Sequence, residues 1–203
     1  MAVTQFTTLV QSTQAEFKDK GSRFLAFASP ILLETDIKPL IQDLREAHHK
    51  ARHCCFAWRL GVDGNRFRAN DDGEPSGSAG RPILGQIDSA QLTDILVVVV
   101  RYFGGTLLGV PGLIHAYKTA AAAAIALGET AEKDIQKIVV LRCEYPHLSG
   151  ALRIAKQFQA TVIQQDLQLD CKLVIQVPLA QLDACWQAWQ DTRVMRLSVE
   201  NQH

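Results

Sequence analysis

The sequence has no excess of charge of either sign, because 21 Lys and Arg residues balance 21 Asp and Glu residues among 203. This balance disfavours a protein that binds nucleic acid through its overall charge. The longest apolar run, 120–127, is far shorter than the roughly 20 residues that a membrane span requires. The chain also begins without a charged and then apolar leader segment. We therefore expect a cytoplasmic protein with no membrane contact.

The five cysteines are too few and too scattered for a disulfide framework, and none of them forms a C-x-x-C pair. An odd number in a chain of this length predicts reduced thiols. A zinc site or a Cys-His nucleophile is conceivable where His48, His49 and His53 precede Cys54 and Cys55. A change from helix to strand near residue 51 would separate the histidines, and free Cys is usually a small buried residue. We predict no metal and no cofactor.

The composition, 47% apolar and 21% charged, is that of an ordinary globular protein. No repeat or Pro-rich linker divides the chain, so a boundary must come from a change in the order of elements. Gly128 follows an Ala-rich run as a helix end should, and the polar stretch 129–134 precedes a new apolar segment. We predict two independently folding domains, 1–130 and 134–203.

The second half alternates strands and helices in a clear order. Apolar patterns predict strands at 137–143, 160–165, 169–177 and 194–199, with helices at 148–159 and from 182 to about 189. The order βαββαβ is that of the ferredoxin-like fold. This fold hosts many functions, RNA binding among them, so by itself it predicts none.

The first half also mixes strands and helices. The patterns predict strands at 5–11, 22–29 and 53–60, a polar loop, a buried central strand at 95–103, and helices at 36–49, from Pro82 and at 112–127. We interpret this half as an α/β domain. The fold class of the whole chain is therefore α+β, with two domains.

An acidic loop and a glycine-rich segment are candidates for chemistry. Clustered carboxylates at Asp71, Asp72 and Glu74 could hold a divalent cation, but they lack EF-hand spacing, and we favour turn capping. In the segment 101–112, Arg101 and free amides at a helix start could attract phosphate. The segment fits neither a P-loop nor G-x-G-x-x-G, and glycines also permit positive φ or close packing. Both interpretations of this segment stay open.

The stretch 45–68 is the one basic part of the chain. It carries six cations, Arg45, Lys50, Arg52, Arg59, Arg66 and Arg68, against two acidic residues, with aromatic residues interleaved. Cations that neutralise phosphates and aromatics that stack on bases would suit RNA. A solvated face over a buried aromatic strand explains the pattern equally well.

Three ordered segments carry a family resemblance. Residues 51–58, 71–80 with Pro82, and 98–105 with the glycines and Tyr117 that follow resemble the YigZ/IMPACT family. The resemblance implies a first domain like domain IV of elongation factor G and a second like its domain V, and thus contact with RNA or the ribosome. The sequence departs from the family pattern at Cys54, Ser78 and Pro111, which weakens a metal or catalytic role for the motif.

Our leading hypothesis is a non-enzymatic RNA- or ribosome-binding protein, a translation-associated regulator that contacts RNA through residues 45–117 and has possible protein partners in translation. The candidate RNA- or anion-binding residues are Arg52, His53, Asp72, Glu74, Arg101, Tyr102, Gly104, Gly105, Gly109, Gly112 and Tyr117.

Two alternatives remain. One is an enzyme acting on a phosphorylated or nucleotide-like substrate, with Arg101 and the loop 105–112 binding the anion and Asp71, Asp72 or Glu74 holding Mg²⁺ or acting as base. The other is a protein-binding adaptor.

Overall fold

The computed structural model describes residues 3–200, and the chain divides into two compact units. The first unit spans Phe6–Lys133, and the second is the chain from Asp134 onward with the short segment that precedes Phe6. Each unit has its own core of buried apolar side chains. Helices combined with antiparallel sheets confirm the α+β fold class. Independent folding of the two parts stays a prediction.

The first unit is built on a five-stranded sheet in the order β2-β3-β6-β4-β5, in which every neighbouring pair is antiparallel. Its strands are β2 (Thr13–Asp19), β3 (Ser22–Pro30), β4 (His53–Leu60), β5 (Arg66–Asn70) and β6 (Ile95–Tyr102). Residues 95–100 of β6 are all buried, which confirms the central strand expected from their apolar run.

The two edge strands of this sheet correct the sequence analysis, which has no strand at β2 and a polar loop at β5. Both strands lie at an edge and expose much of their length to solvent. Polar side chains such as Arg66 and Arg68 are stable there, so no apolar alternation marks β5 as a strand.

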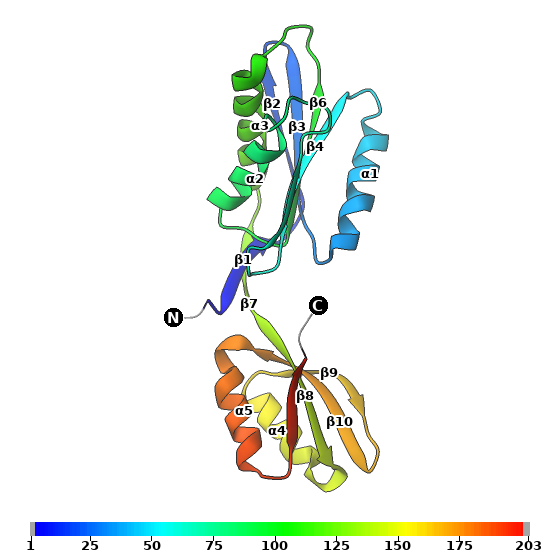
Figure 1. Cartoon of the computed structure of the whole chain (residues 1–203), viewed down its shortest axis with the longest axis vertical. Coiled ribbons are helices and arrows are strands. Elements are labelled where there is room, and N and C mark those ends of the chain that lie inside the picture. Colours follow the sequence, from blue (N-terminus) through cyan, green and yellow to red (C-terminus); the bar gives the residue numbers. More distant parts are fainter. Residues whose placement is uncertain (1–2, 201–203) are drawn as a thin grey trace. The chain divides into compact units, whose positions relative to one another are not determined.

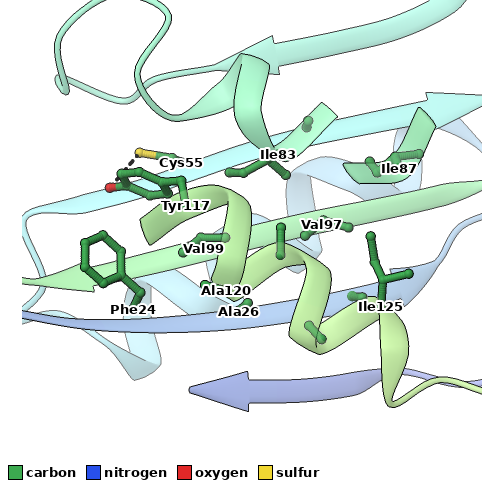
Figure 2. Packing of buried hydrophobic residues seen from close by; sticks show 14 of the residues in the cluster. Phe24, Ala26, Cys55, Ile83, Ile87, Val97, Val99, Tyr117, Ala120 and Ile125 are labelled. Carbon is green, nitrogen blue, oxygen red and sulfur yellow. Dashed lines mark hydrogen bonds between the residues drawn. The ribbon is translucent and has the colours of Figure 1, made fainter. Parts of the chain in front are cut away.

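Helices cover both faces of the sheet, with α1 (Ile37–Ala47) on one face and α2 (Gly80–Ser89) and α3 (Gly109–Ala126) on the other (Figure 1). Figure 2 shows Tyr117, Ala120 and Ile125 of α3 lying over Val97 and Val99 of β6. The small alanine side chains let the helix approach the sheet closely.

The start of α3 is a further correction. The helix predicted at 112–127 begins three residues earlier, at Gly109, so residues 109–111 lie in the helix and not in a loop before it. Pro111 is tolerated because the first N–H groups of a helix have no intrahelical partner.

A two-stranded sheet forms where the first unit ends. It pairs β1 (Gln5–Leu9) with β7 (Thr130–Asp134). The stretch 129–134, expected to be a polar junction, is thus mostly strand, and its mainly exposed side chains explain why no apolar pattern marks it.

The second unit has a four-stranded antiparallel sheet in the order β11-β8-β10-β9. Its elements are β8 (Gln136–Glu144), α4 (Leu148–Gln157), β9 (Thr161–Asp166), β10 (Asp170–Pro178), α5 (Leu182–Asp191) and β11 (Arg196–Glu200), which confirms the order βαββαβ. Trp189 of α5 is fully buried in the core, and its indole N–H donates to the Ala151 carbonyl at 3.2 Å. Within residues 3–200, no helix is long and apolar enough to cross a membrane.

Candidate functional site

The register of the central strands brings together residues that lie far apart in the sequence. β4 pairs with β6 so that His53 lies opposite Arg101 and Cys55 lies opposite Val99. Alternate residues of a strand share a face, so these residues all belong to the face that α2 and α3 cover.

A buried polar cluster, consisting of His53, Cys55, Glu74, Arg101 and Tyr117, forms on this face. Arg101 Nη1 donates to Glu74 Oε1 at 2.7 Å, and the Tyr117 hydroxyl donates to the same oxygen at 2.8 Å. His53 Nε2 lies 4.0 Å from that oxygen. Arg101 is only 6% exposed and Glu74 only 8%. The charge of Arg101 is therefore compensated by Glu74 inside the protein.

The sulfur and phenol groups at this site are held in their neutral forms. The Cys55 thiol lies 3.3 Å from the Tyr117 hydroxyl. Figure 2 marks this hydrogen bond with a dashed line. Burial is the main cause that raises the pKa of both groups. Burial also raises the pKa of the neighbouring Cys54 thiol to about 11. Neither cysteine has the depressed pKa that nucleophilic thiols show.

The acidic loop uses its carboxylates to hold its own backbone. Asp71 accepts hydrogen bonds from the N–H groups of Gly77, Ala79 and Gly80 at 2.8–3.0 Å. Burial alone would raise the pKa of Asp71, but these three donors together outweigh it and hold the pKa below its usual value. This is the turn-capping role that the sequence favours.

Asp72 ties the same loop to two other elements. Its side chain accepts from Arg45 Nη2 of α1 and from the Cys54 N–H of β4, both at 2.6 Å. Its carbonyl oxygen lies 2.8 Å from His53 Nδ1. The residues described in 3–200 contain no group of three His, Cys, Asp or Glu side chains arranged to hold a metal ion.

The remaining predicted residues lie outside the buried polar cluster. Tyr102 is on the other face of β6, and its hydroxyl lies 2.9 Å from His48 Nδ1. Arg52 is exposed just before β4. Gly105 and Gly109 have φ angles of +86° and +70°, a region that favours glycine.

Gly104 serves a different purpose from its neighbours, because it packs against the backbone of Gly21. A Cβ atom at Gly104 would lie 1.9 Å from the Gly21 carbonyl carbon. At Gly104 the packing interpretation of the glycine-rich segment is therefore the one that the structure supports.

A second site lies on the opposite face of the sheet, between α1 and the strands β4 and β5. We call this cavity, of about 380 Å³, the basic groove. It is lined by Glu34, Ile37, Lys38, Ile41, Gln42, Arg45, Phe56, Trp58 and Arg68. The register places Arg68 opposite Trp58 and Arg66 opposite Leu60, so both arginines lie on the α1 face of the edge strand.

The basic stretch identified in the sequence is therefore divided between two faces. Arg59 points away from the groove, pairs with Asp88 at 2.6 Å and lies 5.2 Å from the centre of the Phe67 ring. Arg45 lies at the end of α1 and Arg68 on the edge strand. The sequence analysis missed Lys38, because only the packing of α1 against the sheet brings it to the groove.

Comparisons with known proteins show the family to which the chain belongs. The family model of the Impact N-terminal domain matches residues 20–125. IMPACT family member YigZ of Escherichia coli (strain K12) is 36% identical over 169 residues, which are 80% of this chain and 81% of that protein. IMPACT family member YvyE of Bacillus subtilis (strain 168) is 34% identical over 143 residues, 70% of this chain and 66% of that one.

More distant relatives extend the comparison. A Saccharomyces cerevisiae protein named Protein IMPACT homolog is 33% identical over 115 residues, 54% of this chain and 44% of that protein. A crystal structure of a hypothetical protein matches the whole of both chains with a TM-score of 0.80 and 29% identity. The family model and the bacterial relatives confirm the resemblance seen in the motifs, and the chain belongs to the IMPACT family.

Proposed function

We propose that this protein binds RNA, free or within the ribosome, through the basic groove, and that it does so without catalysis as a regulator associated with translation. The observation that carries the proposal is that Lys38 from α1 and Arg68 from β5 line one cavity, together with Arg45, which is also paired with Asp72. Two further cations, Lys50 and Arg52, are exposed just beyond α1. Cations gathered in this way neutralise several phosphates of one RNA segment.

Local rather than global charge supports this mode of binding. The chain as a whole has a net charge of zero, so attraction to RNA must come from one surface. Counterion release contributes about 0.7 to 0.9 salt-slope units for each neutralised phosphate, so four to six cations correspond to a slope of roughly −3 to −5. The likeness to domains of elongation factor G that the family resemblance implies favours the same class of partner.

The enzymatic alternative has less support. Asp71 is occupied by three backbone donors and Asp72 by Arg45 and the Cys54 N–H, which leaves these carboxylates poorly placed to bind Mg²⁺ or a proton. Glu74 is buried and paired with Arg101. These contacts suit groups that fix a loop in place rather than groups that react.

Replacing Arg66 and Arg68 together with Gln should weaken RNA binding and flatten its salt dependence. If each arginine neutralises one phosphate of a single strand, the slope of log K against log salt should become less negative by about 1.4 units. Fluorescence anisotropy titrations of labelled RNA at several salt concentrations measure this slope.

The matched control is Arg153→Gln, which removes an exposed arginine from α4 in the second unit. It should leave affinity and slope as in the parent. If the double variant also keeps the parent slope, the basic groove is not the RNA-binding surface.

A further inference from the structure

We propose that the basic groove accepts one unpaired base of a single-stranded RNA, with the phosphates on either side of that base held by cations at the rim. This inference rests on the proposed function and adds the class of RNA. It follows from the residues that line the groove, from the cations at its rim, and from which bases of an RNA are free to enter it.

Four of the nine residues that line the groove are apolar, which distinguishes the groove from a site for phosphate alone. Ile37 and Ile41 of α1 face Phe56 and Trp58 of β4, and these aromatic residues are largely buried beneath the cavity. The volume of about 380 Å³ lies within the range of about 300–1,000 Å³ that is typical of small-ligand pockets. A phosphate gains nothing from apolar walls, whereas the flat and partly apolar body of a base does.

Five of the nine residues that line the groove are polar or charged, and such groups can orient a ligand by its edge. Gln42 is one of them, and its Nε2 donates to Glu46 Oε1 at 2.7 Å along α1. That bond fixes the amide and leaves its carbonyl oxygen able to accept from an amino or imino group on a base edge.

The rim carries cations on both sides. Lys38 and Arg45 lie along α1, and Arg68 lies across the groove on β5. Within residues 3–200, neither Lys38 nor Arg68 takes part in an ion pair. A nucleotide chain that passes over the groove places one phosphate on each side of an inserted base, which matches cations on two opposite walls.

Only a single strand offers such a base at low cost. In a duplex each base is stacked and paired, and removing it costs a few kcal/mol. Unpaired bases in loops and single strands are free to turn out of the chain. A duplex would therefore contact the rim but leave the apolar interior of the groove empty.

The test uses the full chain and three labelled RNAs built from ten-nucleotide strands: a uridine decamer, the same decamer with abasic sites at its central positions, and a blunt-ended duplex without loops. We expect the uridine decamer to bind about tenfold more tightly than either of the others, in line with the stacking contribution of one base. The salt slopes of the two decamers should be equal, because their phosphates are the same.

A blunt-ended duplex that binds as tightly as the decamer would overturn base insertion while leaving RNA binding in place. An abasic decamer that binds like the parent decamer would do the same. If no RNA binds but a polyglutamate peptide does, both this inference and the proposed function are wrong, and the groove is a site for acidic peptides.

A variant of the protein, paired with a structurally similar control variant, tests base insertion independently. Gln42→Ala should weaken binding of the uridine decamer by about three- to tenfold and leave the abasic decamer unaffected, because the lost group contacts only the base. The control is Gln187→Ala in α5, which removes the same kind of hydrogen bond, from Nε2 to Asp191 at 2.8 Å. An equal loss for both decamers, or no loss, contradicts a base in the groove.

Discussion

Arg101→Ala should lower the free energy of unfolding by about 3–5 kcal/mol, because it leaves a buried carboxylate without its counter-charge. Among the residues that the structure describes, Glu74 would keep only the Tyr117 hydroxyl as a close donor, in a site that is almost closed to solvent. Urea unfolding followed by circular dichroism measures the change. The same truncation at an exposed arginine, Arg153→Ala, should cost less than about 0.5 kcal/mol.

A second variant separates the loss of the ion pair from the loss of side-chain volume. Combining Arg101→Met with Glu74→Gln removes both charges and should recover much of the stability that Arg101→Ala loses. RNA binding by Arg101→Ala, measured well below its melting temperature, should equal that of the parent. A stable Arg101→Ala protein that no longer binds RNA would instead make Arg101 the anion ligand that the glycine-rich segment suggests.

Gly104→Val should destabilise the first unit by about 3 kcal/mol or more through steric overlap. An added Cβ would lie 1.9 Å from the Gly21 carbonyl carbon and 2.2 Å from the Ser22 nitrogen, and both are backbone atoms that cannot rotate away. The segment that follows β6 would have to separate from the turn between β2 and β3. Thermal and urea unfolding of the variant measure the effect.

The neighbouring glycine is the matched control. Gly105 has a φ of +86° but nothing within 4 Å of an added Cβ atom. Gly105→Ala should therefore cost only the backbone strain of about 1–2 kcal/mol. A larger loss at Gly105 than at Gly104 would contradict this description of the segment.

The elements with strong apolar patterns were predictable from the sequence. The strand His53–Leu60 has the predicted bounds, and the buried central strand ends one residue earlier than expected. Their apolar residues are buried. The hydrophobic effect that stabilises these strands therefore acts on the same residues whose pattern predicts them. The edge strand β5 was missed for the opposite reason, because its exposed arginines need no apolar partner.

The candidate site could be predicted only in part. The sequence contains Glu74, Arg101 and Tyr117, but their meeting depends on the register of β4 against β6 and on the packing of α3, which no local pattern encodes. The basic groove depends on α1 packing against the sheet face on which Arg66 and Arg68 of the missed strand β5 lie. Long-range pairing of this kind is set by tertiary packing.

Photo-crosslinking with 4-thiouridine RNA, followed by mass spectrometry of the crosslinked peptides, tests the central claim most directly. RNA bound in the basic groove should crosslink to residues 34–47 and 56–70 of the intact protein, and Arg66→Gln with Arg68→Gln should reduce the yield. Crosslinks confined to the second unit, residues 134–200, or a yield unchanged in that double variant, would contradict RNA binding through the groove.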